Sequence, residues 1–152
     1  MISRKDGDEC MEIVIATHGE LASGLASACS MICGRDSLQG IHVVTLKDDG
    51  KGITEFEEQV HLLAVKLQGE PVLILTDLFG ATPANVCLRE FQQKQHRIIS
   101  GSSLPCLLEA VLNKSAKDVN ELAEQVLQAG MDGLRRFYFE GNQGGEEEDI
   151  FV

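Results

Sequence analysis

The sequence predicts an α/β fold, a doubly wound and mostly parallel sheet in the strand order 2-1-3-4 with helices on both faces. Short apolar runs alternate with amphipathic stretches along the chain, and this alternation is typical of a parallel sheet covered by helices. At 152 residues the chain is long enough for one domain with a sizeable core. Two of the apolar runs end in polar side chains, as expected where reactive groups gather at the carboxyl edge of an open sheet.

Four apolar runs predict the strands of this sheet. They lie at residues 12–17, 41–46, 72–77 and 97–100. The order 2-1-3-4 is the common doubly wound arrangement and is taken as the expected one. In that order the first and third strands are neighbours, and the gap between them is the switch point where such sheets bind ligands.

The first two segments between strands have the apolar spacing of amphipathic helices. Residues 20–33 are rich in Ala, Ser and Gly, and Gly34 follows as a C-terminal stop. In the next segment a capping box, Thr54 with Glu57, predicts the helix start. The expected inner face of this second helix comprises Ile53, Phe56, Val60, Leu63 and Leu67.

Three further helices are expected in the second half of the chain. Thr82 as N-cap, followed by Pro83, predicts the start of the third. A box formed by Ser115 and Asp118 predicts a last helix that ends at Gly130. The expected inner faces of the third helix and of the short helix after it comprise Ala84, Cys87, Leu88, Phe91, Leu104, Leu107, Leu108 and Val111.

The alternating segment 134–139 predicts an edge strand near the end of the chain. Standing alone, such a strand would expose aromatic side chains and unpaired main-chain groups. Residues 130–133 form a short, flexible link to it, so we expect two copies of the chain to exchange this strand in a homodimer. Residues 1–11 are then a polar extension, 12–139 the domain and 140–152 an acidic, disordered tail.

The composition limits the classes of partner. The net charge is −11, and without the five acids of residues 140–152 there remain 19 acids against 13 bases, a net charge of −6. This balance argues against nucleic acid as a partner and favours a basic protein. No apolar stretch approaches the roughly 18 residues of a membrane span, and the charged first residues do not resemble a secretion signal, so a cytoplasmic location is expected.

The cysteines and most of the histidines are interpreted as structural. Five cysteines show no paired spacing. Cys29 and Cys33 stand one helical turn apart, but no second pair completes a metal site, so free buried thiols in a reducing compartment are expected. His42, His61 and His96 lie in a strand, on a helix and in a turn, where a structural or solvated role is expected.

Polar residues follow two strands that are expected to be neighbours. His18 and Gly19 follow the first strand, and Asp77 ends the third. Because both carboxyl ends lie at one edge of the sheet, the imidazole and the carboxylate are expected to lie together. A carboxylate that accepts a hydrogen bond from one ring nitrogen leaves the other nitrogen free to attack phosphorus. The pattern indicates a phosphoryl carrier with His18 and Asp77 as catalytic residues.

The turn after Asp77 supplies candidate groups for binding the phosphoryl oxygens. They are the main-chain N–H groups around Gly80 and Ala81 and the hydroxyl of Thr82, at a helix N-terminus that attracts anions. Each residue also has a purely structural interpretation, as a turn or helix-start residue. Their coincidence with His18 at two adjacent loops favours function. The chain contains no P-loop and no dinucleotide fingerprint, and no cofactor or metal is expected.

Three segments of the chain together resemble one protein family. They are I-V-I-A-T-H-G at 13–19, T-D-L-F-G-A-T-P-A-N at 76–85 and I-S-G-S-S-L-P at 99–105. In order and spacing they resemble the enzyme IIA component of the mannose family of the bacterial phosphoenolpyruvate-dependent sugar phosphotransferase system, over roughly residues 11–130.

The resemblance implies a doubly wound fold and a phosphotransferase subunit with a phosphohistidine intermediate. His18 would accept a phosphoryl group from the carrier protein HPr and pass it to a IIB domain, which phosphorylates a sugar entering through membrane IIC and IID subunits. Asp77 would orient His18, and Thr82 would bind the phosphoryl group. The last strand of the family is often exchanged between two subunits.

The chain departs from the family pattern at three positions. It has Gly80-Ala81 where Gly-Gly is usual, Ala84 in place of an aromatic residue and Ser103 in place of Asn. Ala81 is compatible with the turn provided that its φ is negative. The other two changes are expected to alter the docking surface, and with it the choice of IIB partner.

Two other functions are alternatives to a transport subunit. A regulatory module, phosphorylated at His18 and binding a protein without serving a transporter, explains the same residues. A flavin-binding module is poorly supported, because the chain has no Trp and one Tyr to stack against the ring.

Overall fold

The computed structural model describes residues 10–115 and 118–140, which form a four-stranded parallel sheet. In order across the sheet, the strands are β2 (Ile41–Leu46), β1 (Glu12–His18), β3 (Val72–Thr76) and β4 (His96–Ile99). This confirms the predicted order 2-1-3-4. In register, Ile13 of β1 lies opposite Ile41 of β2 and Leu73 of β3.

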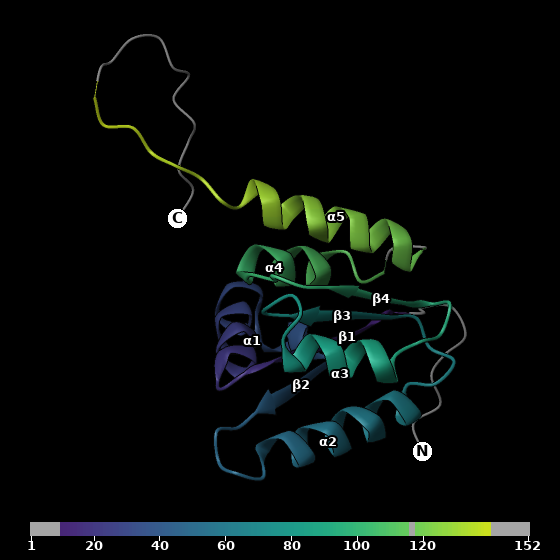
Figure 1. Ribbon diagram of the computed structural model, residues 1–152. Helices are drawn as coiled ribbons and strands as arrows, with labels where there is room; N and C mark the ends of the chain where they lie inside the picture. Colours follow the sequence, from purple (N-terminus) through teal and green to yellow (C-terminus); the bar gives the residue numbers. More distant parts are fainter. Residues whose placement is uncertain (1–9, 116–117, 141–152) are drawn as a thin grey trace.

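Helices cover both faces of the sheet, as predicted (Figure 1). On one face lie α1 (Leu21–Cys33), α4 (Leu104–Leu112) and α5 (Val119–Asp132). On the other lie α2 (Gly52–Lys66) and α3 (Thr82–Glu90). A short 3-10 helix, η1 (Arg35–Leu38), follows α1. None of the helices in the described ranges is long and apolar enough to cross a bilayer.

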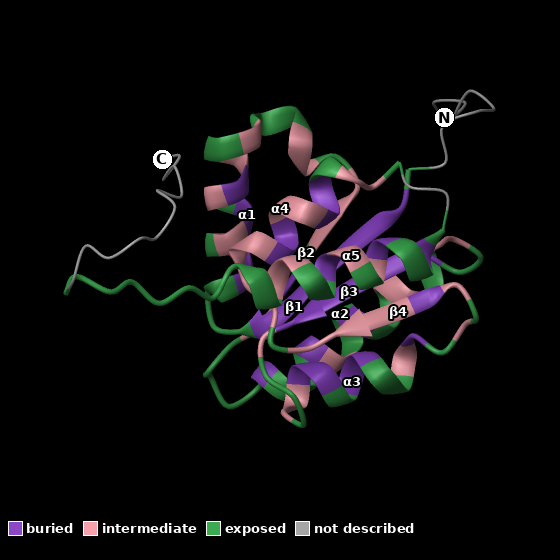
Figure 2. Ribbon diagram, turned by 90° about the horizontal axis from the view of Figure 1, so that it is seen from above, coloured by how far each residue is buried: buried purple, intermediate pink, exposed green. Residues whose placement is uncertain are grey.

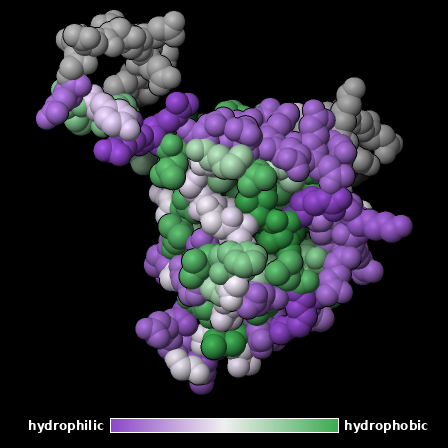
Figure 3. All heavy atoms as spheres, turned by 45° about the horizontal axis from the view of Figure 1, so that its top comes forward, coloured by the Kyte–Doolittle hydropathy of each residue, from purple (hydrophilic) through white to green (hydrophobic). Residues whose placement is uncertain are grey.

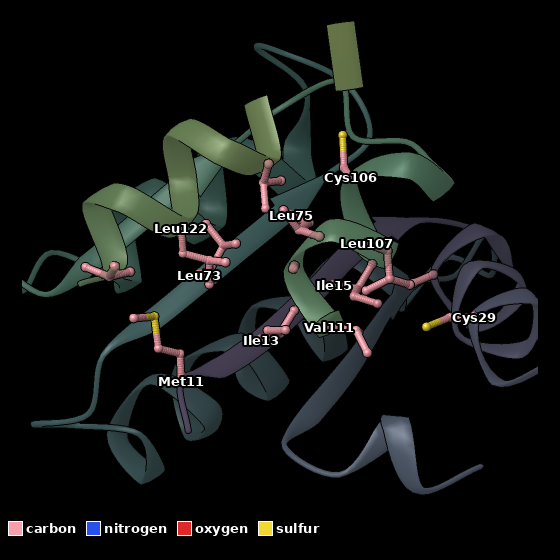
Figure 4. Close-up of a cluster of buried hydrophobic side chains, with 14 residues drawn as sticks. Met11, Ile13, Ile15, Cys29, Leu73, Leu75, Cys106, Leu107, Val111 and Leu122 are labelled. Atoms are coloured by element: carbon pink, nitrogen blue, oxygen red, sulfur yellow. The ribbon is translucent and has the colours of Figure 1, made fainter. Parts of the chain in front are cut away.

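The core lies in two layers because β1 and β3 are buried on both faces (Figure 2). Ile13 and Ile15 point into the layer beneath α1, α4 and α5, where Figure 4 shows them near Leu107. Val14 and Ala16 point into the layer beneath α2 and α3. Burial on both faces explains why these strands read as continuous apolar runs.

The second helix begins earlier than the sequence predicts. Its N-cap is Lys51 and its first residue Gly52, so the capping box Thr54–Glu57 is wrong. A side chain at position 52 would collide with the main-chain carbonyl of Lys47, and this close approach requires glycine at the helix start. Ile53 falls in the first turn, where it is exposed instead of facing the core.

The third helix also begins one position early, with Ala81 and not Thr82 as the N-cap residue. Pro83 lies in the first turn, as predicted. Leu88 is exposed although it was expected on the inner face, and Val86 is buried instead. The inner face differs from the prediction because the buried side chains follow another helical stripe, formed by Pro83, Val86, Cys87 and Phe91.

The last helix differs from its prediction at both ends. Asp118 is the N-cap, and its carboxylate accepts a hydrogen bond from the Asn120 N–H, so the box with Ser115 is wrong. The helix continues through Gly130 to Asp132, and 130–133 is therefore not a link. A Cβ on Gly130 would lie 2.6 Å from Cys106 Sγ, so this glycine permits close helix packing and does not end the helix.

The segment 134–139 forms no strand within the described chain. Its side chains are exposed, and it extends away from the sheet beyond α5 (Figure 1). The expected edge strand is thus absent from the described residues of the single chain, because the segment does not reach the sheet of its own chain. The expected acidic tail and most of the N-terminal extension lie outside the described residues.

Candidate functional site

His18 is the last residue of β1 and lies at the carboxyl edge of the sheet. The turn after it is fixed from two sides. Gly19, with a φ of +53°, donates its N–H to the Leu46 carbonyl at the end of β2, at 2.8 Å. Thr17 Oγ1 accepts a hydrogen bond of 2.8 Å from the Ala22 N–H in the first turn of α1. The backbone that carries the imidazole is therefore held by both neighbouring elements.

Asp77 meets His18 across the gap between β1 and β3. Its Oδ2 accepts the main-chain N–H of His18 at 3.0 Å and lies 2.9 Å from the ring Nδ1. The Asp77 side chain is 13% exposed and that of His18 is 46% exposed. The strand order brings together the two residues that were predicted to be catalytic.

This contact determines which ring nitrogen can react. An ionised carboxylate only accepts hydrogen bonds, so Nδ1 carries the proton that it donates to Asp77. In the neutral imidazole, Nε2 then has the free lone pair. Because the His18 side chain is half exposed, Nε2 is the nucleophile that the geometry offers. Asp77 Oδ1 is buried and has no hydrogen-bond partner among the described residues.

The turn after Asp77 leads directly to the N-terminus of α3. Gly80 has a φ of +77°, which a glycine adopts without strain. Ala81 has a φ of −89°, so its methyl group adds no strain where the family usually has a second glycine. The first turn of α3 contains no acidic residue, which leaves the positive end of its dipole uncompensated, whereas the N-cap residue of α1 is Glu20.

The predicted phosphoryl-binding residues follow Asp77 in this turn. Within the described chain, Gly80, Ala81 and Thr82 make no direct hydrogen bond with His18. Their N–H groups and hydroxyl lie instead at the N-terminus of α3, which contacts β1 and β3. Such an arrangement can bind an anion.

Two departures from the family pattern have different surroundings. Ala84 is buried, so it contributes to packing beneath α3 and not to an exposed docking surface, contrary to expectation. Ser103 is partly exposed, and its hydroxyl lies 3.4 Å from Cys106 Sγ. Leu78 and Phe79, in the turn after Asp77, carry exposed apolar side chains, and Phe79 is 86% exposed.

The remaining histidines lie elsewhere in the fold. His42 Nε2 contacts Glu12 Oε2, and His61 Nδ1 contacts Glu90 Oε2, both at 2.8 Å. His96 is buried at the start of β4, and this burial lowers the pKa of its imidazole. The His61 pair shows that a histidine–carboxylate contact alone does not define the site. What distinguishes His18 is its position at the carboxyl edge of the sheet, at the end of β1 and against the carboxylate that follows β3.

The cysteines are free thiols, and Cys29, Cys87 and Cys106 are buried as expected. Cys10 is exposed and Cys33 only partly buried, so the expectation of burial is wrong for these two. Burial raises the pKa of the Cys87 thiol to about 12. Such a thiol is protonated at neutral pH and inert as a nucleophile.

Sequence reasoning missed several residues that shape the site. Thr76 Oγ1 and Ser100 Oγ lie 2.8 Å apart, and the Ser102 N–H donates to the Thr76 carbonyl at 2.9 Å, which joins the loop after β4 to β3. Asn85 Nδ2 donates to the Gly80 carbonyl at 3.0 Å. Asn in the first turn of a predicted helix was the available indication, because its side chain readily bonds nearby main-chain groups.

Comparison with known proteins gives concordant matches. The family model EIIA-man, described as PTS system fructose IIA component, matches residues 12–127. The chain is 26% identical to the PTS system fructose-specific EIIA component of Bacillus subtilis, over 92% of this chain and 99% of that protein. It is 25% identical to the PTS system sorbose-specific EIIA component of Lacticaseibacillus casei, over 77% and 83% of the two chains.

Solved structures share the fold. The mannose/sorbose-specific IIA subunit from Enterococcus faecalis superposes with a TM-score of 0.77 at 23% identity, covering 88% of this chain and 98% of that one. The PTS IIA protein associated with the fucose utilization operon of Streptococcus pneumoniae gives a TM-score of 0.73 at 27% identity, covering 83% and 92%.

Proposed function

Because the chain belongs to the EIIA-man family of phosphotransferase-system IIA components, we propose that it carries phosphoryl groups on His18. The phosphoryl group comes from phospho-HPr and passes to a IIB domain, which phosphorylates a sugar entering through membrane IIC and IID subunits. The observation that carries this proposal is the contact of His18 Nδ1 with Asp77 Oδ2 at the carboxyl edge. The protein acts in the cytoplasm.

The phosphoryl transfer follows from the tautomer. His18 Nε2 attacks the phosphorus of the donor phosphohistidine, the new N–P bond forms as the donor N–P bond breaks, and the donor imidazole leaves. The His18 ring gains positive charge, which the Asp77 carboxylate stabilises through the proton on Nδ1. The N–H groups around Gly80 and Ala81, together with the Thr82 hydroxyl, bind the phosphoryl oxygens. Transfer to the IIB domain repeats these steps with His18 as the leaving group.

The assembly proposed with this function is a homodimer that exchanges residues 134–139. Two observations support it. The segment is exposed and forms no strand within the described residues, and β4 forms an outer edge of the sheet. Figure 3 shows hydrophobic side chains gathered in the middle of the face seen there, bordered by hydrophilic ones. Pairing with this edge would bury the aromatic side chains of the segment.

The test is phosphorylation of the full chain by phosphoenolpyruvate, enzyme I and HPr, followed by intact mass measurement. We expect one phosphoryl group, stable in alkali and labile in acid, and none in His18→Ala. His61→Ala is the matched control, because its Nδ1 also contacts a carboxylate, and it should be phosphorylated normally. Phosphorylation of His18→Ala would refute the assignment. Transfer onward to a IIB domain separates a transport subunit from a purely regulatory module, which would not pass the group on.

A further inference from the structure

A side chain of α3 reaches back to the turn that follows Asp77. Asn85 Nδ2 donates a hydrogen bond to the Gly80 carbonyl at 3.0 Å, and the Asn85 main-chain N–H donates to the Ala81 carbonyl, also at 3.0 Å. One residue therefore holds two consecutive carbonyls of the turn. Asn85 is itself exposed and does not contribute to the core.

Holding the Gly80 carbonyl fixes the direction of the next N–H group. The described chain contains no cis peptide bond, so the carbonyl of Gly80 and the N–H of Ala81 point in opposite directions across one rigid plane. The side chain of Asn85 attracts the carbonyl, and the N–H therefore faces away from Asn85. The Ala81 N–H donates to the Leu78 carbonyl at 3.4 Å, which is longer than a usual N–H···O hydrogen bond. A donor with so weak a partner changes acceptor at little cost.

The conformation of Gly80 makes this restraint necessary. Glycine has no side chain, and a Cβ at position 80 would have no atom within 4 Å, so packing does not hold the residue at its φ of +77°. Glycine samples positive and negative φ about equally, and the peptide after it would otherwise rotate. Among the described residues, the bond from Asn85 is the side-chain contact made to this peptide.

We propose that Asn85 is a positioning residue for phosphoryl transfer, acting through the Gly80–Ala81 peptide. It keeps the Ala81 N–H available to an oxygen of the phosphoryl group on His18. Asn85 does not touch the phosphoryl group, and the inference rests on the proposed function.

The experiment measures phosphoryl acceptance over a range of phospho-HPr concentrations, using the full chain. The variants are Asn85→Ala, Asn85→Gln and the matched control Asn113→Ala. Asn113 Nδ2 also donates to a main-chain carbonyl, that of Glu109 at 2.9 Å, at the far end of α4. Asn113 adjoins Lys114, whose carbonyl binds Met11 before β1, at the opposite edge of the sheet from His18.

We expect Asn85→Ala to lower the limiting rate about tenfold, because a misdirected donor costs less than the 10²- to 10³-fold loss seen when a donor is removed. The half-saturating donor concentration should stay within about twofold, since the docking surface is unchanged. Asn85→Gln, with a longer side-chain amide, should recover most of the rate, and Asn113→Ala should match the wild type. On phosphorylation, the amide resonance of Ala81 should shift in the wild type and shift less in Asn85→Ala.

Other outcomes overturn the inference. An unchanged limiting rate in Asn85→Ala, or a change in half-saturation alone, would show that Asn85 does not position the transfer. Equal slowing in Asn113→Ala would show a general effect of losing such a bond. In these cases the wild type is still phosphorylated on His18, and the proposed function stands. A wild-type chain that gains no phosphoryl group refutes the proposed function and this inference with it.

Discussion

Replacing Asp77 by Asn tests the central contact of the site, because it preserves size and removes the charge. Asp77 Oδ2 holds both the main-chain N–H and the ring Nδ1 of His18. If the amide oxygen takes this position, both bonds survive without charge, and the NH₂ group enters the place of Oδ1, which is buried without a partner. If the amide is reversed, its NH₂ faces the main-chain N–H and donates to Nδ1, which leaves the proton on Nε2.

Both orientations slow phosphoryl acceptance, for different reasons. In the first, the bond to the ring loses about 1–2 kcal/mol of charge assistance as positive charge develops. In the second, the nucleophilic nitrogen is protonated. The loss of charge assistance alone corresponds to a rate about 5- to 30-fold lower. Molecules in the reversed orientation lower the rate further, so we expect a total loss of about 10²-fold, since replacing a tautomer-fixing carboxylate by an amide is costly in other enzymes. The buried NH₂ should also lower the free energy of unfolding by about 1–3 kcal/mol while leaving the chain folded.

The assay is single-turnover transfer from phospho-HPr, with circular dichroism to establish folding. Glu90→Gln is the matched control, because Glu90 Oε2 lies 2.8 Å from His61 Nδ1 without adjoining the site, and its rate should equal that of the wild type. A folded Asp77→Asn chain with an unchanged rate would mean that Asp77 is only a turn residue. Equal slowing in Glu90→Gln would attribute the effect to net charge.

Three further predictions concern stability and assembly. Gly80→Ala should lower the free energy of unfolding by about 1–2 kcal/mol, because φ is +77° there, while Ala81→Gly should not remove such strain; urea unfolding compares the two. Burial holds the pKa of His96 below its usual 6.5, so its contribution to stability is present above that pH and lost as pH falls through the lowered value; His96→Asn should flatten the pH dependence of urea unfolding, and an equally steep profile would contradict this. Sedimentation should show a dimer for the full chain and for a chain ending at Gly141 and a monomer for one ending at Gly133; a monomeric full chain would exclude the exchange.

The sequence predicted those features that depend on local pattern and on strand order. Fully apolar runs identified β1 and β3, and the common doubly wound order then placed His18 beside Asp77. The predicted helix starts were wrong where a contact outside the helix determines its first residue. At Gly52, that contact is the close approach to the Lys47 carbonyl. The bond from Asn85 to Gly80 escaped notice because no pattern in the sequence specifies which carbonyl a side-chain amide will reach.

The strand predicted at 134–139 failed for another reason. Its alternation satisfies the rule for an edge strand, yet the single chain provides no partner that the segment reaches. The sequence pattern identifies a segment that is able to pair with a sheet. It does not specify whether that sheet belongs to the same chain or to another copy.

The bond from the His18 main-chain N–H to Asp77 makes the site a reporter of correct folding. The same carboxylate oxygen binds the backbone at the end of β1 and the ring of His18. A slip of one residue between β1 and β3 would displace these groups by about 3.3 Å and point the imidazole to the other face of the sheet. Under the proposed function, a misfolded chain would then not accept a phosphoryl group, and the fraction of a preparation that becomes phosphorylated would report the fraction of molecules whose central strands are in register.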